Sequence, residues 1–481
     1  MTKIIEFPKR RPTDLEEDLR RMVSDWKRRP RKTSEVLLAF EERLAARLQE
    51  AHREVMSEVL RAGDVGNADA VQYEGRVCRR VLTSSTTYMT MAGPVEVSRG
   101  LYRDRQTEGA SFAPLEKRLG IIDGFWTPKA AREALWMVTQ MVPAKAAEAL
   151  KRVGGMPVSK SSLQRLPSQV SETWEAHRAE LEKELFETQE VPVGTDVLAV
   201  SLDGVYAPIE NADEDESHVE TRRRKHAVGE AARGPDAYRE VGCASIAFYS
   251  AGGDVLGAVR FGRAPEPNKL GVKAMLADYL KAILHKNASL RVIYLSDGAP
   301  NHWSFFDELP FEGRQALDFF HAAEHLNAAL GAAFGEGSVK ARRTFAEKRH
   351  ILLEEHGSAA AIQRSLARLS GKKGLSAHAR TKIERAARYF REHKARMNYA
   401  ELKAAGYPIG SGVMEAACKT LVAQRLKLSG QRWSVSGAQA ILTPRGWDQS
   451  DRFDEAFALL AGLYEEDVQV YAPTTGRLAS G

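Results

Sequence analysis

The spacing of apolar residues divides the chain into helical and strand-rich parts. Apolar residues recur every three or four positions through residues 12 to 62, which predicts one or two long charged helices. From Gln72 to Arg105 the pattern changes to Val, Thr and Tyr on both sides of Ala92-Gly93-Pro94, which predicts a β-hairpin. Helical spacing returns between Trp126 and Trp174, and strands dominate residues 197 to 300.

The most apolar strand pattern is Val197 to Tyr206, VLAVSLDGVY. Its near-continuous aliphatic run predicts a strand buried on both faces, in the middle of a mixed or parallel sheet. An ionised Asp203 there is costly unless a cation or hydrogen-bond donors meet it. A second run, Arg291 to Pro300, repeats the pattern with Asp297 before a glycine. Two strands that each end in Asp-Gly predict metal ligands, although an Asp-Gly turn without a function is common.

The strand-rich part continues into helices. The order is strand, hairpin, helix, strand, and Gln315 to Leu330 then runs from a short apolar strand into a helix. Residues 340 to 402 show helical spacing without any strand pattern, which predicts an insertion. The glycine-rich segment GYPIGSG follows and leads into a helix that carries Glu415 in its first turn.

Composition places the chain among ordinary globular proteins. It has 481 residues, 43% hydrophobic and 28% charged, enough for two to four domains. No run approaches eighteen apolar residues and the N-terminus has no signal-peptide pattern, so we expect a cytoplasmic protein without a membrane partner. Three widely spaced cysteines indicate neither a disulfide framework nor a cysteine zinc site.

Charge is concentrated in one part of the chain. The net charge is only +6, but Ser338 to Trp433 contains 21 Lys and Arg against 7 Asp and Glu, a local excess of +14. Such an excess is typical of a surface that binds a phosphate backbone. A solvated helical surface is the alternative that charge alone leaves open.

Asp203, Asp297 and Glu415 together form a candidate catalytic site. Phosphodiester chemistry with two divalent ions needs hard oxygen ligands on separate rigid elements, which hold the ions about 3.5 to 4 Å apart. A glycine after each Asp leaves room for a phosphate. Glu415 alone is also explained as a carboxylate favoured by a helix N-terminus, with Glu401 as its substitute.

This order of motifs resembles that of the DDE transposases, and specifically the ISKra group of bacterial insertion-sequence transposases, relatives of the Mutator-like elements. The resemblance covers about residues 75 to 450. The motifs that carry it, in order, are Ser201-Leu202-Asp203-Gly204-Val205-Tyr206, Tyr238-Arg239-Glu240-Val241, Leu295-Ser296-Asp297-Gly298-Ala299, Asp318-Phe319-Phe320-His321 with Glu324-His325-Leu326, and Ile409-Gly410-Ser411-Gly412-Val413-Met414-Glu415.

The resemblance implies an α/β, RNase H-like catalytic domain built on a mixed sheet, interrupted by an all-helical insertion. It implies Asp203, Asp297 and Glu415 as catalytic residues and as ligands of two Mg²⁺ or Mn²⁺ ions. Asp318 and His321 would form the family's Asp/Cys-x-x-His motif beside the active site, although a core histidine explains His321 equally well. The chain departs from many relatives in lacking paired cysteines after its tyrosine-rich strand and in carrying a charged insert at 210 to 236.

The expected activity is that of a DNA transposase. Such an enzyme binds double-stranded DNA at the terminal inverted repeats of its element, cuts a strand and joins the freed 3′-hydroxyl to target DNA. Synapsis of two ends implies a homodimer or a higher oligomer, in a bacterial cytoplasm near the nucleoid.

The expected domains follow the changes of pattern. In chain order they are a helical arm for dimerisation or DNA contact (1–70), a small β-rich module (71–125), a helical, helix-turn-helix-like DNA-binding region (126–190), the first part of the catalytic domain (191–335), the basic helical insertion (336–405), the last part of the catalytic domain (406–450), and a C-terminal helix and tail (451–481).

Two surfaces are candidates for DNA contact. After the glycine turn at 154 to 155, Ser159 is a plausible N-cap for a helix that Pro167 should shorten. Its exposed face would offer Lys160, Ser161, Gln164 and Arg165, although helical hairpins without a DNA partner have the same pattern. Behind Glu415, the candidates that would hold the backbone or stack on a base are Lys419, Arg425, Lys427, Arg432 and Trp433. A buried Trp433 in a C-terminal helix pair is the commoner arrangement.

Two other functions fit parts of the sequence. His321-Ala-Ala-Glu324-His325 matches a zinc-protease motif, with Glu392 or Glu401 as a third ligand. That interpretation leaves the twin Asp-Gly strands and the basic insertion unexplained. A non-catalytic DNA-binding protein of the same fold is the other alternative, and a nuclease without strand transfer is a close variant of the transposase hypothesis.

Overall fold

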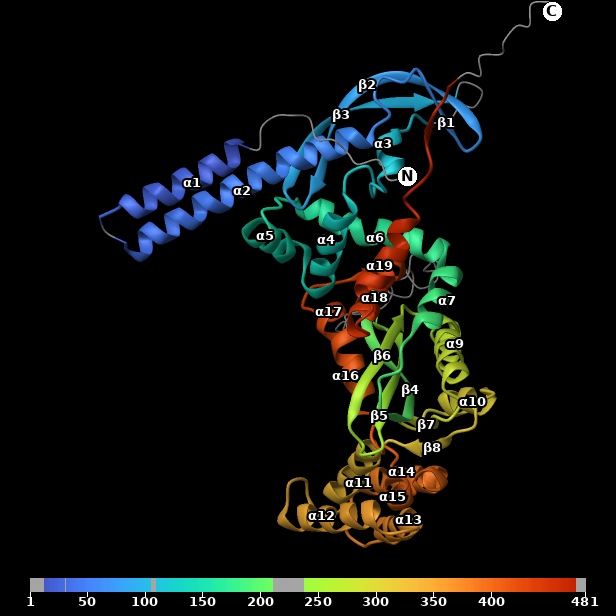
Figure 1. Cartoon of the computed structure of the whole chain (residues 1–481). Helices are drawn as coiled ribbons and strands as arrows, with labels where there is room; N and C mark the ends of the chain where they lie inside the picture. Colours follow the sequence, from blue (N-terminus) through green and yellow to red (C-terminus); the bar gives the residue numbers. More distant parts are fainter. Residues whose placement is uncertain (1–12, 31, 105–109, 211–237, 473–481) are drawn as a thin grey trace, which may run out of the picture. The chain divides into compact units, whose positions relative to one another are not determined.

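The structure is a computed structural model that describes residues 13–30, 32–104, 110–210 and 238–472. The chain forms two compact units, which are described separately (Figure 1). The first comprises Met1–Gln169 and Phe457–Gly481, and the second comprises Val170–Ala456. The charged insert after β4 lies outside the described residues, so its role stays untested.

The first unit combines a helical hairpin with a small antiparallel sheet. Helices α1 (Thr13–Arg28) and α2 (Ser34–Gly63) are the two long helices that the sequence predicts. The sheet has the order β10-β1-β2-β3. Its strands are β1 (Ala70–Tyr73), β2 (Arg76–Thr90), β3 (Gly93–Arg103) and β10 (Gln469–Val470). The β2–β3 pair confirms the predicted hairpin, whereas β10 was missed because two residues carry no periodic signal.

The helical region confirms the predicted order and corrects one detail. After α3 (Pro114–Arg118), helices α4 (Pro128–Gln140), α5 (Pro143–Val153) and α6 (Lys160–Ala176) follow. Ser159 Oγ accepts a hydrogen bond from the Ser162 N–H at 3.0 Å, as an N-cap does. The expectation that Pro167 shortens α6 was wrong, because the helix continues through it for nine more residues. Leu163, Leu166, Val170 and Trp174 are buried along one face, and this burial outweighs the lost hydrogen bond.

The second unit is built on a mixed sheet of order β6-β5-β4-β7-β8. Strand β5 (Tyr238–Ser250) pairs antiparallel with both β4 (Thr195–Glu210) and β6 (Val255–Arg263). Strand β7 (Arg291–Ser296) runs parallel to β4, and β8 (Arg314–Leu317) runs parallel to β7. The sheet confirms the mixed α/β fold class that the strand patterns predict.

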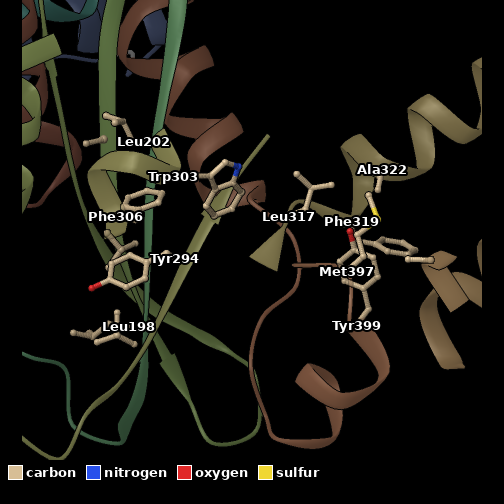
Figure 2. Packing of buried hydrophobic residues seen from close by; sticks show 14 of the residues in the cluster. Leu198, Leu202, Tyr294, Trp303, Phe306, Leu317, Phe319, Ala322, Met397 and Tyr399 are labelled. Carbon is tan, nitrogen blue, oxygen red and sulfur yellow. The ribbon is translucent and has the colours of Figure 1, made fainter. Parts of the chain in front are cut away.

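Strand β4 is buried on both faces, as its apolar run predicts. Leu198, Val200 and Leu202 belong to one core cluster, whereas Val197 and Ala199 belong to another on the opposite face. Figure 2 shows Leu198 and Leu202 with Tyr294, Trp303 and Phe306 in the larger cluster. Alternation along a strand therefore sends even-numbered side chains to one face and odd-numbered ones to the other.

Helices surround this sheet in the order expected. They are α7 (Arg178–Thr188), α9 (Leu270–Lys286), preceded by the 3₁₀ turn Pro267–Lys269, α10 (Pro300–Glu308) and α18 (Val435–Gln449). Helix α19 (Phe453–Gly462) follows α18 in the chain and runs from the second unit into the first. None of the helices within the described residues is both long enough and apolar enough to cross a membrane.

The predicted insertion is helical throughout. Helix α11 (Phe319–Phe334) precedes it, and its own helices are α12 (Val339–Glu354), α13 (Ser358–Ser370), α14 (Ala377–His393), the 3₁₀ turn Lys394–Arg396 and α15 (Tyr399–Ala404). Leu317, Phe319, Ala322, Met397 and Tyr399 pack together where the insertion meets the sheet (Figure 2). The chain then returns to the sheet, since the Phe319 N–H donates to the Ile409 carbonyl at 3.0 Å.

The segment after the insertion contains an irregular helix. Helix α16 (Gly412–Ala417) carries Glu415 in its first turn, as predicted. It continues as a π-helical turn, Cys418–Ala423, and then as α17 (Gln424–Leu426). The expected position of the following tryptophan in a helix pair was wrong. Trp433 begins the short strand β9 (Trp433–Ser434), which pairs in parallel with β4 opposite Ile209.

Candidate functional site

Asp203 and Asp297 lie side by side on adjacent parallel strands. The last register pair between β4 and β7 is Ser201 with Leu295, and each aspartate follows two residues later. Both occupy odd positions, so they share the face that carries Val197 and Ala199. Strand β4 continues past Asp203 along β5 to Glu210, so the prediction that Asp203 ends a strand was wrong. Asp203 instead marks where β4 loses its partner β7, while Asp297 directly follows the end of β7.

Asp203 is held by two donors. The Gly204 N–H donates to Oδ1 at 2.7 Å, and the Cys418 thiol donates to Oδ2 at 3.6 Å. Burial raises the pKa of Asp203, the Gly204 N–H opposes the rise, and the charge of Asp297 adds to it. The charge of Asp297 makes the ionised form of Asp203 less stable. A divalent cation bound to both carboxylates would remove this repulsion.

Asp297 is fixed from its own loop. Its Oδ1 accepts from Ser296 Oγ at 3.1 Å and from the Ala299 N–H at 3.1 Å. The Tyr389 hydroxyl donates to the backbone carbonyl of Asp297 at 2.7 Å. Gly298 follows with φ of +107°, a backbone conformation that favours glycine and that turns the chain sharply away from β7.

Glu415 is exposed, and its carboxylate lies with Asp318 and His321 instead of with the two aspartates. Its carboxylate, one oxygen of Asp318 and one ring nitrogen of His321 lie within 4.8 Å of one another. Among the residues that the structure describes, this is the one group of three such side chains with metal-ligand spacing, and neither Asp203 nor Asp297 belongs to it. The structure thus brings Asp203 and Asp297 together, and separately brings Glu415 to the Asp-x-x-His motif.

Asp318 links this motif to the helix of Glu415. Its buried carboxylate caps α11 by accepting from the His321 N–H at 2.7 Å, and it also accepts from the Ser411 N–H. His321 Nδ1 lies 3.7 Å from the same carboxylate, which raises the pKa of His321 to about 9. Burial opposes ionisation of Asp318, but the hydrogen bonds from His321 and Ser411 prevail and lower its pKa. At neutral pH the motif is therefore an ion pair, and His321, 38% exposed, is not a core histidine.

This pair predicts a pH-dependent stability. The folded pKa of His321, about 9, exceeds its unfolded value near 6.5, so the pair stabilises the fold fully below pH 6.5 and loses its effect as the pH rises through 9. We expect His321→Asn to lower the free energy of unfolding more at pH 6 than at pH 9.5, measured by urea denaturation. An equal loss at both values would contradict the ion pair.

The zinc-protease constellation does not assemble. The His325 ring stacks on Tyr389, with centroids 3.9 Å apart and planes at 21°. His321 Nδ1 lies 3.7 Å from the Asp318 carboxylate, and its group with metal-ligand spacing contains Asp318 and Glu415 and not His325. Glu401 lies 4.0 Å from Arg314, at the start of β8, whereas the two aspartates lie at or beyond the ends of the β4–β7 pairing. Glu401 is therefore a poor substitute for Glu415.

The DNA-binding candidates differ in exposure. Lys160, Ser161, Gln164 and Arg165 are all exposed on one side of α6. Behind Glu415, Lys419, Lys427 and Arg432 are exposed as well.

The expectation that Arg425 contacts DNA was wrong. Arg425 is 1% exposed, and its guanidinium lies 5.0 Å from the ring centroid of Trp433. Burial lowers its pKa to about 10. Arg425 comes six residues after Lys419, which at about 100° per residue is not on the same helix face, and it lies inward just beyond the π-helical turn Cys418–Ala423. Trp433 is half-buried, and its indole N–H donates to the Leu426 carbonyl at 3.2 Å.

The exposed lysines and the buried Arg425 predict different effects of substitution. Lys419→Ala with Lys427→Ala should weaken DNA binding and reduce the slope of log K against log salt by about 2, because each lysine neutralises one phosphate. Arg425→Ala should instead lower the free energy of unfolding by about 2–3 kcal/mol, through lost packing against Trp433. Binding titrations at several salt concentrations and urea denaturation separate the two effects. A stable Arg425→Ala protein with a reduced salt slope would contradict this assignment.

Sequence reasoning missed the contacts that Lys269, His302 and Cys418 make beside the aspartates. Lys269 and His302 are buried and lie 3.2 Å apart (Nζ to Nε2), and Lys269 also pairs with Glu240 at 2.9 Å. Burial and the Lys269 charge lower the pKa of His302 to about 4, so its ring is neutral. Glu240 belongs to a motif that the family resemblance contains, but no periodic signal marks Lys269. Cys418 was missed too: contact with Cys243, burial and Asp203 raise its pKa, so it stays a donor to Asp203.

Comparison with known proteins adds little to this geometry. No protein-family model matches the chain, and no curated protein matches it in sequence. Among solved structures, the Drosophila P element transposase strand transfer complex is similar over 71% of this chain and 82% of its own chain, with 10% identity and a TM-score of 0.26. A likeness at that level carries no weight for fold or function.

Proposed function

We propose that the protein is a DDE transposase with an RNase H-like catalytic domain, which cuts the ends of its own element and joins them to target DNA. The observation that supports this most is the parallel register of β4 and β7, which sets Asp203 and Asp297 opposite each other on one sheet face. Paired strands lie about 4.8 Å apart, so aspartates at corresponding positions of β4 and just after β7 would be suitable ligands for shared Mg²⁺ or Mn²⁺ ions. The mixed sheet interrupted by a helical insertion is the architecture that the motif resemblance implies.

Glu415 completes the proposed triad. Cys418 lies three residues later on the same helix and reaches Asp203 Oδ2 at 3.6 Å. Residues three apart share a helix face, so the Glu415 side chain starts within one turn of Asp203. Because the Glu415 side chain is exposed, its carboxylate would turn from His321 toward the aspartates when the ions bind. His321 then serves as an alternative partner that orients the carboxylate.

The chemistry follows from these positions. When bound, two divalent ions lower the pKa of the attacking water or 3′-hydroxyl and stabilise charge on the leaving oxygen. Asp203, Asp297 and Glu415 would hold these ions. His321, cationic at neutral pH, would contact the scissile phosphate. No serine or tyrosine nucleophile is required.

The surrounding surfaces would bind DNA. The exposed side of α6, with Lys160, Ser161, Gln164 and Arg165, and the cations Lys419, Lys427 and Arg432 near the carboxylates would bind the terminal repeats. The basic insertion would extend the contact to the phosphate backbone. The arm formed by α1 and α2 would pair two copies during synapsis.

The test uses labelled duplexes taken from both flanks of the coding sequence, incubated with the purified protein and a target plasmid. We expect binding, Mg²⁺-dependent nicking that yields a 3′-hydroxyl, and joining to the plasmid. Binding without cutting would favour the non-catalytic alternative, and cutting without joining a nuclease. Bound zinc by elemental analysis, with activity lost in His321→Ala and kept in Asp203→Ala, would overturn the proposal in favour of a protease.

A further inference from the structure

Lys269 has two properties that are unusual for a lysine. Its side chain is only 8% exposed, and its backbone is left-handed, with φ of 57° and ψ of 38°. The preceding residue, Asn268, is also left-handed, with φ of 52°. Such conformations are unfavourable for residues with a side chain and persist only where surrounding contacts enforce them. The contacts of the Lys269 ammonium are therefore the place to look for a role.

The ammonium begins a chain of hydrogen bonds whose direction is fixed. A lysine ammonium only donates, so His302 Nε2, 3.2 Å from Lys269 Nζ, must accept. His302 Nδ1 then carries the proton and donates to Ser296 Oγ at 2.9 Å. Ser296 Oγ, having accepted, directs its own hydrogen to Asp297 Oδ1 at 3.1 Å. Reversing the later hydrogen bonds would put the His302 proton on Nε2, and that would break the bond from Lys269.

The chain approaches the aspartates from the opposite face of the sheet. Ser296 follows Tyr294 at an even position of β7, toward the core that contains Trp303 of helix α10. Asp297 follows on the face that it shares with Asp203. The polar chain therefore crosses from the helix-covered side of the sheet to the carboxylate at the end of β7.

Glu240 holds the other end of this chain. Its Oε1 lies 2.9 Å from Lys269 Nζ and packs over Gly204, where an added Cβ would lie 2.0 Å from the same oxygen. The glycine after Asp203 thus makes room for Glu240, besides any room that it leaves for a phosphate. The Glu240–Lys269 pair therefore contacts β4 next to Asp203. It is also linked to Asp297 by the hydrogen bonds of His302 and Ser296.

We propose that Lys269 is a positioning residue for Asp297: through His302 and Ser296 it commits Oδ1 of that carboxylate to a hydrogen bond and orients Oδ2 toward the shared ion site. This inference rests on the proposed function, because it takes Asp297 as a metal ligand. Groups that orient a ligand in this way typically change metal affinity about 10- to 100-fold when removed.

The experiment measures Mn²⁺ binding to the full-length protein by calorimetry. We expect Ser296→Ala, which removes the last link without disturbing the ion pair, to weaken Mn²⁺ binding about 10-fold, and Lys269→Met to do the same. The double variant should be no weaker than either single one, because both act through one chain. Lys281→Met, exposed on helix α9, which begins directly after Lys269, is the matched control and should bind Mn²⁺ normally.

A second readout does not depend on metal or activity. Nitrogen-15 spectra of histidine-labelled protein, assigned with His302→Asn, should show His302 as the Nδ1–H tautomer in the parent and in Ser296→Ala. In Lys269→Met that tautomer should be lost or mixed with the other. An Nε2–H tautomer in the parent, or additive losses of Mn²⁺ affinity in the double variant, would overturn the inference.

The outcomes also separate this inference from the proposed function. If Asp203→Asn and Asp297→Asn leave Mn²⁺ binding unchanged, the metal site itself is wrong. If those variants abolish binding while Lys269→Met and Ser296→Ala bind as the parent does, the metal site stands and the positioning role fails. Thermal unfolding of each variant identifies any protein that has not folded, and Ser296→Ala carries the test if Lys269→Met is unstable.

Discussion

Asp203→Asn is expected to reduce DNA cleavage at least about 10³-fold while leaving DNA binding within about twofold. Asparagine keeps the size of the side chain and the acceptor for the Gly204 N–H, so the fold has no reason to change. It removes the charge that would hold both ions. Cleavage is measured on labelled flanking duplexes in saturating Mg²⁺, and binding by titration of the same duplexes without metal.

The matched control is Asp307→Asn. Asp307 is exposed on α10 and accepts from Gln315 Nε2 at 2.6 Å, a bond that asparagine preserves. It removes one negative charge from the same unit without touching the aspartate pair, so cleavage should be unchanged. Cleavage by Asp203→Asn at a rate close to that of the parent would remove Asp203 from the active site and with it the proposed triad.

Asp318→Ala should produce the largest loss of stability, about 3–5 kcal/mol in the free energy of unfolding. Asp318 is fully buried, and its two oxygens satisfy the N–H groups of His321 and Ser411 as well as the charge of the His321 ring. Alanine leaves all three without their partner. The same contacts anchor the loop before Glu415, so the substitution should also release α16. Urea denaturation followed by tryptophan fluorescence reports the change.

Asp318→Asn provides the intermediate case. It keeps an acceptor for the His321 N–H that caps α11 but brings an amide N–H₂ against the Ser411 N–H. We expect a loss smaller than that of alanine and larger than that of Asp307→Asn. A loss below about 1 kcal/mol in Asp318→Ala would show that the motif is not a structural junction between α11 and the Glu415 helix.

Local patterns predicted the strands that carry the site, because apolar runs depend on short-range periodicity. The run Val197 to Tyr206 lies in β4, and Arg291 to Ser296 forms the parallel strand β7, whose register with β4 ends two residues before each aspartate. The sequence did not indicate that β4 continues past Asp203, since its partner there is β5 and not β7. Pairing partners are tertiary information that a single strand pattern lacks.

Two expectations about helices were wrong. Arg425 comes six residues after Lys419, and residues six apart do not share a helix face; Arg425 follows the π-helical turn and is buried against Trp433. Pro167 likewise continues a helix that its ring should interrupt. In both cases burial decides the outcome, and burial depends on segments distant in sequence. Lys269 was hidden for the same reason, because its two polar partners, Glu240 and His302, come from β5 and α10.

The surroundings of the Glu415 carboxylate differ most from the prediction. Its place in the first turn of α16 was predicted, but its carboxylate lies with Asp318 and His321, within 4.8 Å of both. The contact from Cys418 to Asp203 keeps that helix beside the aspartates. A carboxylate that leaves His321 when ions and DNA arrive would couple assembly of the triad to substrate binding.

The most direct test of the account is a crystal structure of the protein grown with Mn²⁺, with the ions located by anomalous scattering. We expect two Mn²⁺ peaks about 3.5–4 Å apart, both bound by Asp203, with Asp297 on one and Glu415 on the other. A single peak at Asp318, His321 and Glu415, with none at Asp203 and Asp297, would contradict the proposed active site.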